Sequence, residues 1–166
     1  MMNWNNNINP VEYLSITGVV LAVYPHTENC CYQVIEISTP EAGIANLIAG
    51  PDTYFVRQAR IIPGMQIIGF YDGNAPMPLI YPPQYNALVI GEATSWQNIK
   101  VDFFDRNLVS SDRTLRLNIS DSTDIITKTG QDFLCGVSDH TLIVLYGAAT
   151  RSIPAQTTPD QIIVLC

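Results

Sequence analysis

The sequence predicts an all-β protein. Helical periodicity of apolar residues is almost absent along its 166 residues, and the apolar runs are short and rich in Val, Ile, Thr and Tyr. Gly, Pro, Asn and Asp bound these runs, as turn residues bound strands. In the first part of the chain we expect strands at 17–25, 31–38, 43–50, 64–72 and 85–92.

A second set of five runs follows the first. The segment "YFVRQARII" (54–62) fits neither set clearly and could hold a short helical turn between strands. The strands expected in the second set lie at 98–105, 114–120, 123–129, 140–147 and 161–166.

The two sets of five strands predict an internal repeat. "VIEIS" (34–38) matches "RLNIS" (116–120), and "QIIGFYDGNA" (66–75) matches "TLIVLYGAAT" (141–150), which pairs Tyr71 with Tyr146. "PPQYNALVI" (82–90) matches "TPDQIIVLC" (158–166), which pairs Pro83 with Pro159. The matches keep their order, which favours duplication over the alternative, chance similarity between β-rich segments.

Five strands per unit, with the main interruption between the third and the fourth, is the layout of an OB-fold barrel. The fold prediction is therefore two tandem five-stranded OB-like barrel units with an N-terminal arm. Small immunoglobulin-like sandwiches come second, because they usually need more strands per unit. The predicted parts are an arm over 1–15, a first unit over 16–94 and a divergent second unit over 95–166.

The stretch "GFYDGNAPMPLIYPPQY" (69–85), here called the Tyr/Pro stretch, joins the fourth and fifth strands of the first unit. Together with "PDTYFV" and "IIPGMQ" before it, it resembles small proteins of clostridia and other Firmicutes that look like single OB-type domains. The resemblance covers about residues 16–92 and implies a fold and a bacterial origin, but no activity. The second unit departs from the pattern, since "GAATRSIPAQTTPDQ" keeps two prolines and no aromatic residue.

The Tyr/Pro stretch has two interpretations. Its aromatic residues could stack on a sugar or contact a peptide, because this loop often flanks the ligand groove of OB folds. Alternatively its four prolines make a stiff connector whose apolar residues cover the barrel or a neighbouring subunit. The residues predicted to contact a ligand or a subunit are Phe70, Tyr71, Met77, Leu79, Tyr81 and Tyr85.

The composition limits the partners. Charged residues make up 14% of the chain, well below the usual share, and the net charge is −7. Residues 1–94 contain only Arg57 and Arg60 as basic residues, so the cation cluster that nucleic acids require is missing. No apolar run is long enough to span a bilayer, which predicts no membrane insertion. The start "MMNWNNNINPVEYLS" does not read as a secretory signal.

Catalytic patterns are weak. "CGVSDH" (135–140) places Cys, Ser, Asp and His together, but local adjacency rarely gives a converging catalytic set, and a polar turn explains it better. His26, Cys30, Cys31 and His140 could supply zinc ligands, yet their spacing matches no known zinc motif. We therefore expect no enzyme, no bound metal and no cofactor. A small metal-dependent enzyme is the weakest alternative.

The four cysteines and the N-terminal arm point to contacts between copies. A thiol on Cys166, the last residue, is well placed to reach another molecule, although four idle thiols in a reducing cytosol are an equal alternative. The arm could add a strand to a neighbour's sheet edge or pack across its own barrel. The predicted assembly or cross-link residues are Cys30, Cys31, Cys135, Cys166, Trp4, Ile8 and Tyr13.

The leading hypothesis is a self-assembling structural protein, a subunit of an extracellular or spore-surface filament or layer that binds copies of itself. Release without a signal peptide would bring it to the surface, where disulfides could link the copies; a cytoplasmic location is the alternative. The second hypothesis is a glycan- or peptide-binding module of the OB type that uses the aromatic loop 70–85.

Overall fold

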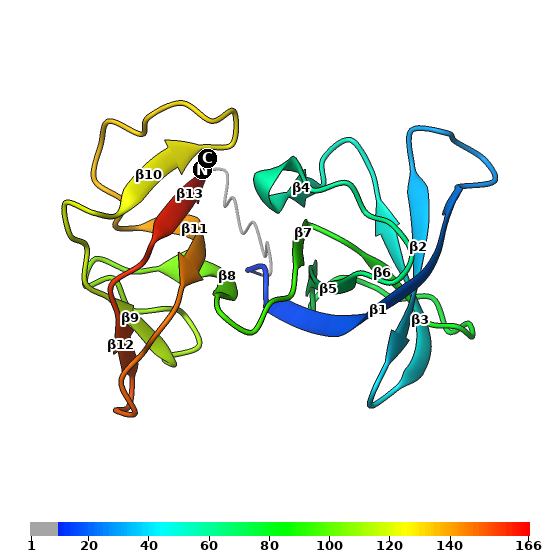
Figure 1. Cartoon of the computed structure of the whole chain (residues 1–166), viewed down its shortest axis with the longest axis horizontal. Coiled ribbons are helices and arrows are strands. Elements are labelled where there is room, and N and C mark those ends of the chain that lie inside the picture. Colours follow the sequence, from blue (N-terminus) through cyan, green and yellow to red (C-terminus); the bar gives the residue numbers. More distant parts are fainter. Residues whose placement is uncertain (1–9) are drawn as a thin grey trace, which may run out of the picture.

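The structure, a computed structural model, describes residues 10–166 and consists there of β-strands and one short 3-10 helix, which confirms the all-β prediction. Figure 1 shows two groups of strands, one formed by residues 13–92 and the other by residues 98–165. The first group comprises β1 (Tyr13–Pro25), β2 (Gln33–Thr39), β3 (Gly43–Ala49), β4 (Tyr54–Phe55), β5 (Gln66–Asp72), β6 (Gln84–Asn86) and β7 (Val89–Glu92). The second comprises β8 (Asn98–Phe104), β9 (Leu115–Leu117), β10 (Asp124–Thr127), β11 (His140–Tyr146), β12 (Ala155–Thr157) and β13 (Gln161–Leu165).

The first group forms one seven-stranded sheet. β1, β2 and β3 are an antiparallel meander, β1 also pairs with β5, and β5 pairs with β7. β6 pairs in parallel with β3, and only Ala87 and Leu88 separate β6 from β7. The single segment 84–92 therefore pairs with β3 through β6 and with β5 through β7. The ambiguous segment 54–62 holds β4 and then the 3-10 helix η1 (Val56–Gln58), which is the short helical turn that the sequence allows there.

The second group repeats this pairing scheme in a shortened form. β8 pairs with β11 as β1 pairs with β5, and β11 pairs with β13 as β5 pairs with β7. β10 pairs in parallel with β13 as β4 does with β7, and β9 pairs in parallel with β12 as β3 does with β6. Tandem copies of one unit would give this recurrence, while duplication itself stays a prediction.

The strand registers correct two of the predicted repeat matches. Phe70 of β5 pairs with Val89, and Leu145 of β11 pairs with Gln161, so Val89 corresponds to Gln161. The same offset in residue number matches Pro82 with Pro154. This replaces the predicted match of Pro83 with Pro159. The peptide bonds before Pro82 and Pro154 are both cis.

The match of "VIEIS" with "RLNIS" is also wrong. "VIEIS" lies in β2, whereas "RLNIS" begins in β9, which pairs as β3 does. Isolated bridges from Phe104 to Ser110 and from Val109 to Arg116 place residues 109–110 between β8 and β9, where β2 would lie. The match of Tyr71 with Tyr146 fits the registers, because both residues stand near the ends of corresponding strands.

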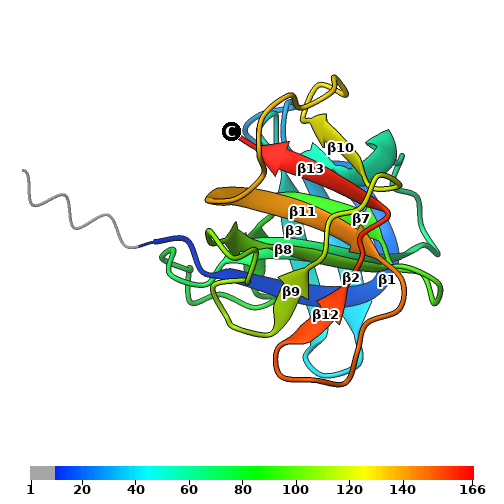
Figure 2. The same cartoon turned by 90° about the vertical axis from the view of Figure 1, so that its left-hand side faces the viewer.

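Three hydrophobic clusters hold the molecule together. One lies within the first group around Ile35 and Leu47, and another within the second group around Phe104 and Leu142. The third, here called the joint cluster, contains buried residues from both groups: Val56, Phe70, Val89, Val101, Ile143, Leu145 and Ile163. Figure 2, viewed from the side of the second group, shows β8, β11 and β13 lying across the strands of the first.

The structure corrects the predicted end of the N-terminal arm and agrees with the predicted position of the joint between the two groups of strands. Residues 13–15, expected in the N-terminal arm, belong to β1, where Tyr13 pairs with Asp72 and Ser15 with Phe70. Every pairing between named strands joins residues on the same side of 93–97, the region predicted as the joint between units. The OB-type assignment and the unit boundaries 16–94 and 95–166 stay predictions.

Candidate functional site

The loop between β5 and β6, residues 73–83, is fixed at its ends and free at its tip. Near its start, Asn74 donates its side-chain Nδ2 hydrogen to the carbonyl oxygen of Pro10 at 2.7 Å, and the backbone N–H of Gly73 donates to Glu12 at 2.7 Å. At its end, the carbonyl oxygen of Pro83 accepts from the backbone N–H of Asn46 at 2.9 Å. The two ends are thus bonded to different strands or segments, which fixes where the loop projects.

The tip of this loop exposes apolar side chains to solvent. Leu79 is 104% exposed and Tyr81 is 80% exposed, while Ile80 and Met77 are 51% and 41% exposed. The loop contains no charged residue. An uncharged, apolar projection of this kind marks a contact surface more often than a solvated connector.

Tyr71 and Tyr85 stand at the base of the loop, with ring centroids 4.5 Å apart and planes tilted by 48°. Burial raises the pKa of Tyr71, with smaller contributions from Tyr85 and Glu12. The pair separates two cavities that both rings line, one of about 280 Å³ beside Pro76–Pro78 and one of about 380 Å³ beside Ser15–Thr17 and Pro40. Two aromatic rings between two hollows can contact a flat sugar face or a prolyl ring.

One predicted contact residue is wrong. Phe70 is only 4% exposed and packs in the joint cluster, because its side chain points to the opposite side of β5 from that of Tyr71. It is therefore unavailable to a ligand or a subunit. Of the predicted residues, Tyr71, Met77 and Tyr85 line one cavity, whereas Leu79 and Tyr81 are exposed on the loop itself.

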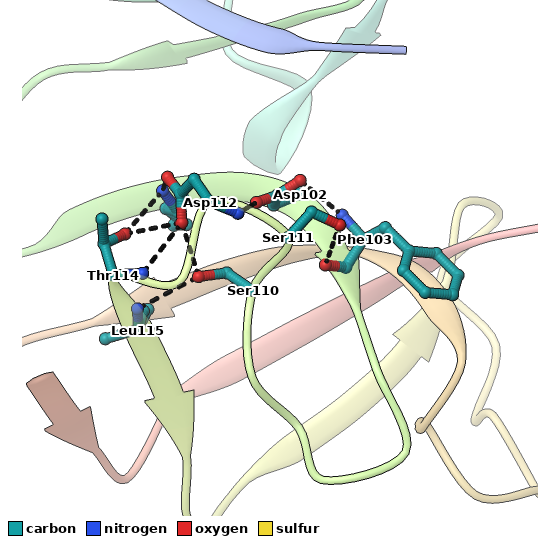
Figure 3. Close-up of polar contacts among 8 residues, drawn as sticks. Asp102, Phe103, Ser110, Ser111, Asp112, Thr114 and Leu115 are labelled. Atoms are coloured by element: carbon teal, nitrogen blue, oxygen red, sulfur yellow. Dashed lines mark hydrogen bonds and ion pairs between the residues drawn. The ribbon is translucent and has the colours of Figure 1, made fainter. Parts of the chain in front are cut away.

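A second polar site, which the sequence reading missed, lies on the connection between β8 and β9 (Figure 3). The carboxylate of Asp112 accepts hydrogen bonds from Lys100, from the hydroxyl of Ser110 at 2.6 Å, and from the N–H and hydroxyl of Thr114 at 3.1 and 2.7 Å. Asp102 accepts from the backbone N–H groups of Phe103 at 2.8 Å and Asp112 at 3.1 Å. The sequence signal that could have found it is the short polar run "SSDRT" between two apolar segments.

The pKa values of the two carboxyl groups in this cluster shift in opposite directions. Burial alone would raise the pKa of Asp112, but the hydrogen bonds from Lys100, Ser110 and Thr114 outweigh it and lower that pKa to about 2. Burial raises the pKa of Asp102 despite the two backbone N–H donors. Both carboxylates are occupied by donors of their own chain, so the cluster acts as a clasp on the β8–β9 connection.

A cavity of about 630 Å³ lies beside this cluster, between residues 10–14 and the strands β8 and β11. Tyr13 lines this cavity. Burial raises the pKa of its phenol, and a hydrogen bond with Thr141 offsets only part of that increase. Tyr13 also packs against the joint cluster. Its side chain therefore contacts its own chain, and its predicted role in contacts between copies stays a prediction. Trp4 and Ile8 lie outside the described residues.

The "CGVSDH" turn shows no converging catalytic arrangement. His140 begins β11, its Nδ1 atom lies 2.8 Å from the carbonyl oxygen of Ser138, and its ring meets Phe133 edge-on with centroids 5.5 Å apart. Cys135 is exposed and unbonded. Over residues 10–166, no three His, Cys, Asp or Glu side chains are grouped so that they could hold a metal ion.

The cysteines are all free and exposed: Cys30, Cys31, Cys135 and Cys166. Cys30 and Cys31 lie in the β1–β2 connection, where the N–H of Cys31 donates to Asn29 Oδ1 at 2.9 Å. No disulfide joins any two of them within the chain, and each thiol is accessible to a second molecule.

Within residues 10–166, no helix is long and apolar enough to cross a membrane. Comparisons with protein families, with curated proteins and with solved structures gave no match.

Proposed function

We propose that this protein is a non-enzymatic structural subunit whose copies bind one another through the loop 73–83. The observation that carries the proposal is the fully exposed, uncharged loop tip with Leu79 and Tyr81, tied to the body at both ends. Large apolar side chains at the end of a projecting loop gain most free energy when a partner covers them.

The loop loses little conformational freedom on binding. Its four prolines restrict the backbone before any partner arrives, so less entropy is lost when the loop is held. Burying the side chains of Leu79 and Tyr81 in a contact would contribute roughly 1.5–3 kcal/mol each. The loop 73–83 carries no charged residue, so no charge has to be buried in the contact.

The proposal includes two OB-like units. Support comes from the first group of strands, in which a three-stranded meander pairs through β1 with β5, and segment 84–92 pairs with both β3 and β5. A five-stranded barrel closed in this order is the OB arrangement.

We place the assembly at an extracellular or spore surface, as a filament or layer, without nucleic acid. The four exposed thiols agree with this placement, because in an oxidising environment they could link neighbouring copies by disulfides.

Size measurement tests the proposal. Sedimentation velocity over a wide concentration range, with and without reductant, should show association of the wild type. Leu79→Ser combined with Tyr81→Ser should shift association to at least tenfold higher concentration. Leu134→Ser is the matched control, because Leu134 is 90% exposed on a loop of the second group. A wild type that stays monomeric in every condition, or equal loss in the control, would contradict the proposal.

A second candidate function is glycan or peptide binding at the Tyr71–Tyr85 pair, favoured by the two cavities that share these rings. Glycan and peptide arrays probed with wild type, Tyr71→Ala and Tyr85→Ala test this site, and Tyr81→Ala is the control because Tyr81 lines neither cavity. Binding that weakens in the Tyr71 and Tyr85 variants but not in Tyr81→Ala supports a ligand at the pair. Unchanged binding in the Tyr71 and Tyr85 variants rules the pair out.

A further inference from the structure

A cavity of about 610 Å³ lies where the two groups of strands meet, away from the Tyr/Pro stretch and from the Asp102–Asp112 cluster. Residues of β4 and η1 form one side of it, and the end of β10 with the turn that follows forms the other. Ligand sites occur preferentially at such joints between units. The lining residues include Arg57, Gln58, Lys128, Thr129 and Gly130.

Two cations and no acidic side chain line this cavity. The chain has eight basic residues and a net charge of −7, so a local excess of positive charge is unusual in it. Over residues 10–166, the ion pairs involve Lys100 and Arg113, and neither Arg57 nor Lys128 takes part in one. Two cations that line one cavity, with no acidic side chain in its lining, favour the approach of an anion.

Arg57 is held in a costly conformation that fixes its position. Its φ and ψ are 57° and 24°, and Gln58 follows with φ 50°, so two consecutive non-glycine residues adopt the left-handed region. Such conformations persist only where the surroundings impose them, and they concentrate at functional sites. Here Val56, buried in the joint cluster immediately before Arg57, anchors the turn.

Two contacts hold the guanidinium of Arg57, one with an aromatic ring and one with a side-chain amide. Its Cζ atom lies 5.7 Å from the ring centroid of Trp96, and Nη2 donates to Oε1 of Gln97. Gln97 is buried, and its own Nε2 donates to Asp160 at 3.1 Å, which fixes the amide. The other N–H groups of the guanidinium have no acceptor in the described part of the chain. A planar donor held in this way is suited to a carboxylate or a phosphate.

We infer that this cavity binds a small anion that carries a carboxylate or phosphate group, with Arg57 as the oriented donor and Lys128 as the second cation. Because the lining comes from both groups of strands, a bound anion bridges them. An anion that binds only the folded chain stabilises it by RT ln(1 + c/Kd), where c is the free anion concentration, so the stabilisation grows with the logarithm of that concentration once the site is mostly filled. The inference stands apart from self-association through the loop 73–83, since it shares no residue with that loop.

The test is an NMR titration of the full chain with inorganic phosphate and, separately, with succinate, at constant ionic strength set by sodium chloride. We expect saturating shifts of the backbone amides of Gln58, Thr129 and Gly130 with at least one of the two anions. Saturation by phosphate alone or by succinate alone identifies the preferred group, and saturation by both supports the shared chemistry.

Two variants and one control sharpen the test. Arg57→Gln and Lys128→Gln should each weaken binding about tenfold, since each removes one charge-assisted contact. Lys128 is exposed, so its variant should fold even if Arg57→Gln does not. Arg151→Gln, an exposed arginine outside the cavity, should bind as the wild type does. Absence of saturation with both anions, or equal binding in Lys128→Gln and wild type, would overturn the inference.

Discussion

Asp112 is the residue whose side chain makes most contacts on the β8–β9 connection. Its two carboxylate oxygens accept from Lys100, Ser110 and Thr114, while its backbone N–H donates to Asp102. We expect Asp112→Ala to lower the free energy of unfolding by about 1–2 kcal/mol, because several donors lose a charged acceptor at a partly exposed site. Urea denaturation at pH 7 measures it. A change as small as that of an ordinary surface substitution would contradict the clasp.

The same carboxylate predicts a pH dependence of stability. Its pKa is lowered from 3.8 to about 2 in the folded protein, so the folded state favours the ionised form. This contribution is fully present above about pH 4 and is lost as the pH falls through about 2. Asp112→Asn should therefore lose less stability than the wild type between pH 4 and pH 2, measured by urea denaturation. Parallel stability curves for the two proteins would exclude this linkage.

The thiols allow a direct prediction at the residue scale. All four cysteines are exposed and unbonded, so all four should react with a thiol reagent such as dithionitrobenzoate in the native, reduced protein. Reaction should be complete without denaturant. If any thiol reacted only after unfolding, its exposure and its proposed role in cross-links would both be wrong.

At the scale of elements, β1 depends on a glycine. Gly18 pairs with Ile67 on one side, and a Cβ atom on it would meet the backbone oxygen of Ser38 in β2 at 2.6 Å. Because a backbone atom of a central strand cannot move aside easily, Gly18→Ala should cost about 1–3 kcal/mol of stability. Gly136→Ala is the matched control, since an added Cβ there meets nothing within 4 Å. Equal melting temperatures of the two variants would refute the close approach.

The strands themselves were predictable from sequence, and their partners were not. Each predicted range overlaps an observed strand, because short Val- and Ile-rich runs between turn residues are a local signal. β4 and β12 were missed as strands, since two- and three-residue strands owe their form to parallel partners distant in sequence. The predicted alignment of the two repeats was wrong for the same reason. Pro83 was matched with Pro159 by similarity of the sequence, whereas the true correspondence depends on which strands pair.

For the candidate sites too, features that depend on local sequence were predictable and features that depend on packing between distant segments were not. The exposure of Leu79 and Tyr81 agrees with a proline-rich, uncharged loop read from the sequence. The cavity lined by Arg57 and Lys128 could not be predicted, because these residues are 71 positions apart in the chain and line one cavity only through the packing of the two groups of strands. The burial of Phe70 was hidden as well, since both faces of β5 carry aromatic residues and only one of them faces the joint.

At the scale of the whole molecule, the joint cluster decides whether the two groups of strands behave as one folding unit. Its buried residues come from both, including Phe70 and Val89 on one side and Leu145 and Ile163 on the other. Separating the groups would expose these side chains to water, at a cost of about 1.5–3 kcal/mol for each large one. Such a cost links the stability of one group to that of the other.

Leu145→Ala tests this link. Leu145 is completely buried in the joint cluster, so truncation should cost about 2–5 kcal/mol and should lower hydrogen-exchange protection in both groups, including the distant strands β2 and β3. Leu142→Ala is the control, because Leu142 is equally buried but lies in the cluster of the second group. Native-state exchange followed by mass spectrometry resolves the two groups. If Leu145→Ala reduced protection only in residues 98–165, the groups would fold independently and the joint would be a contact between separate domains.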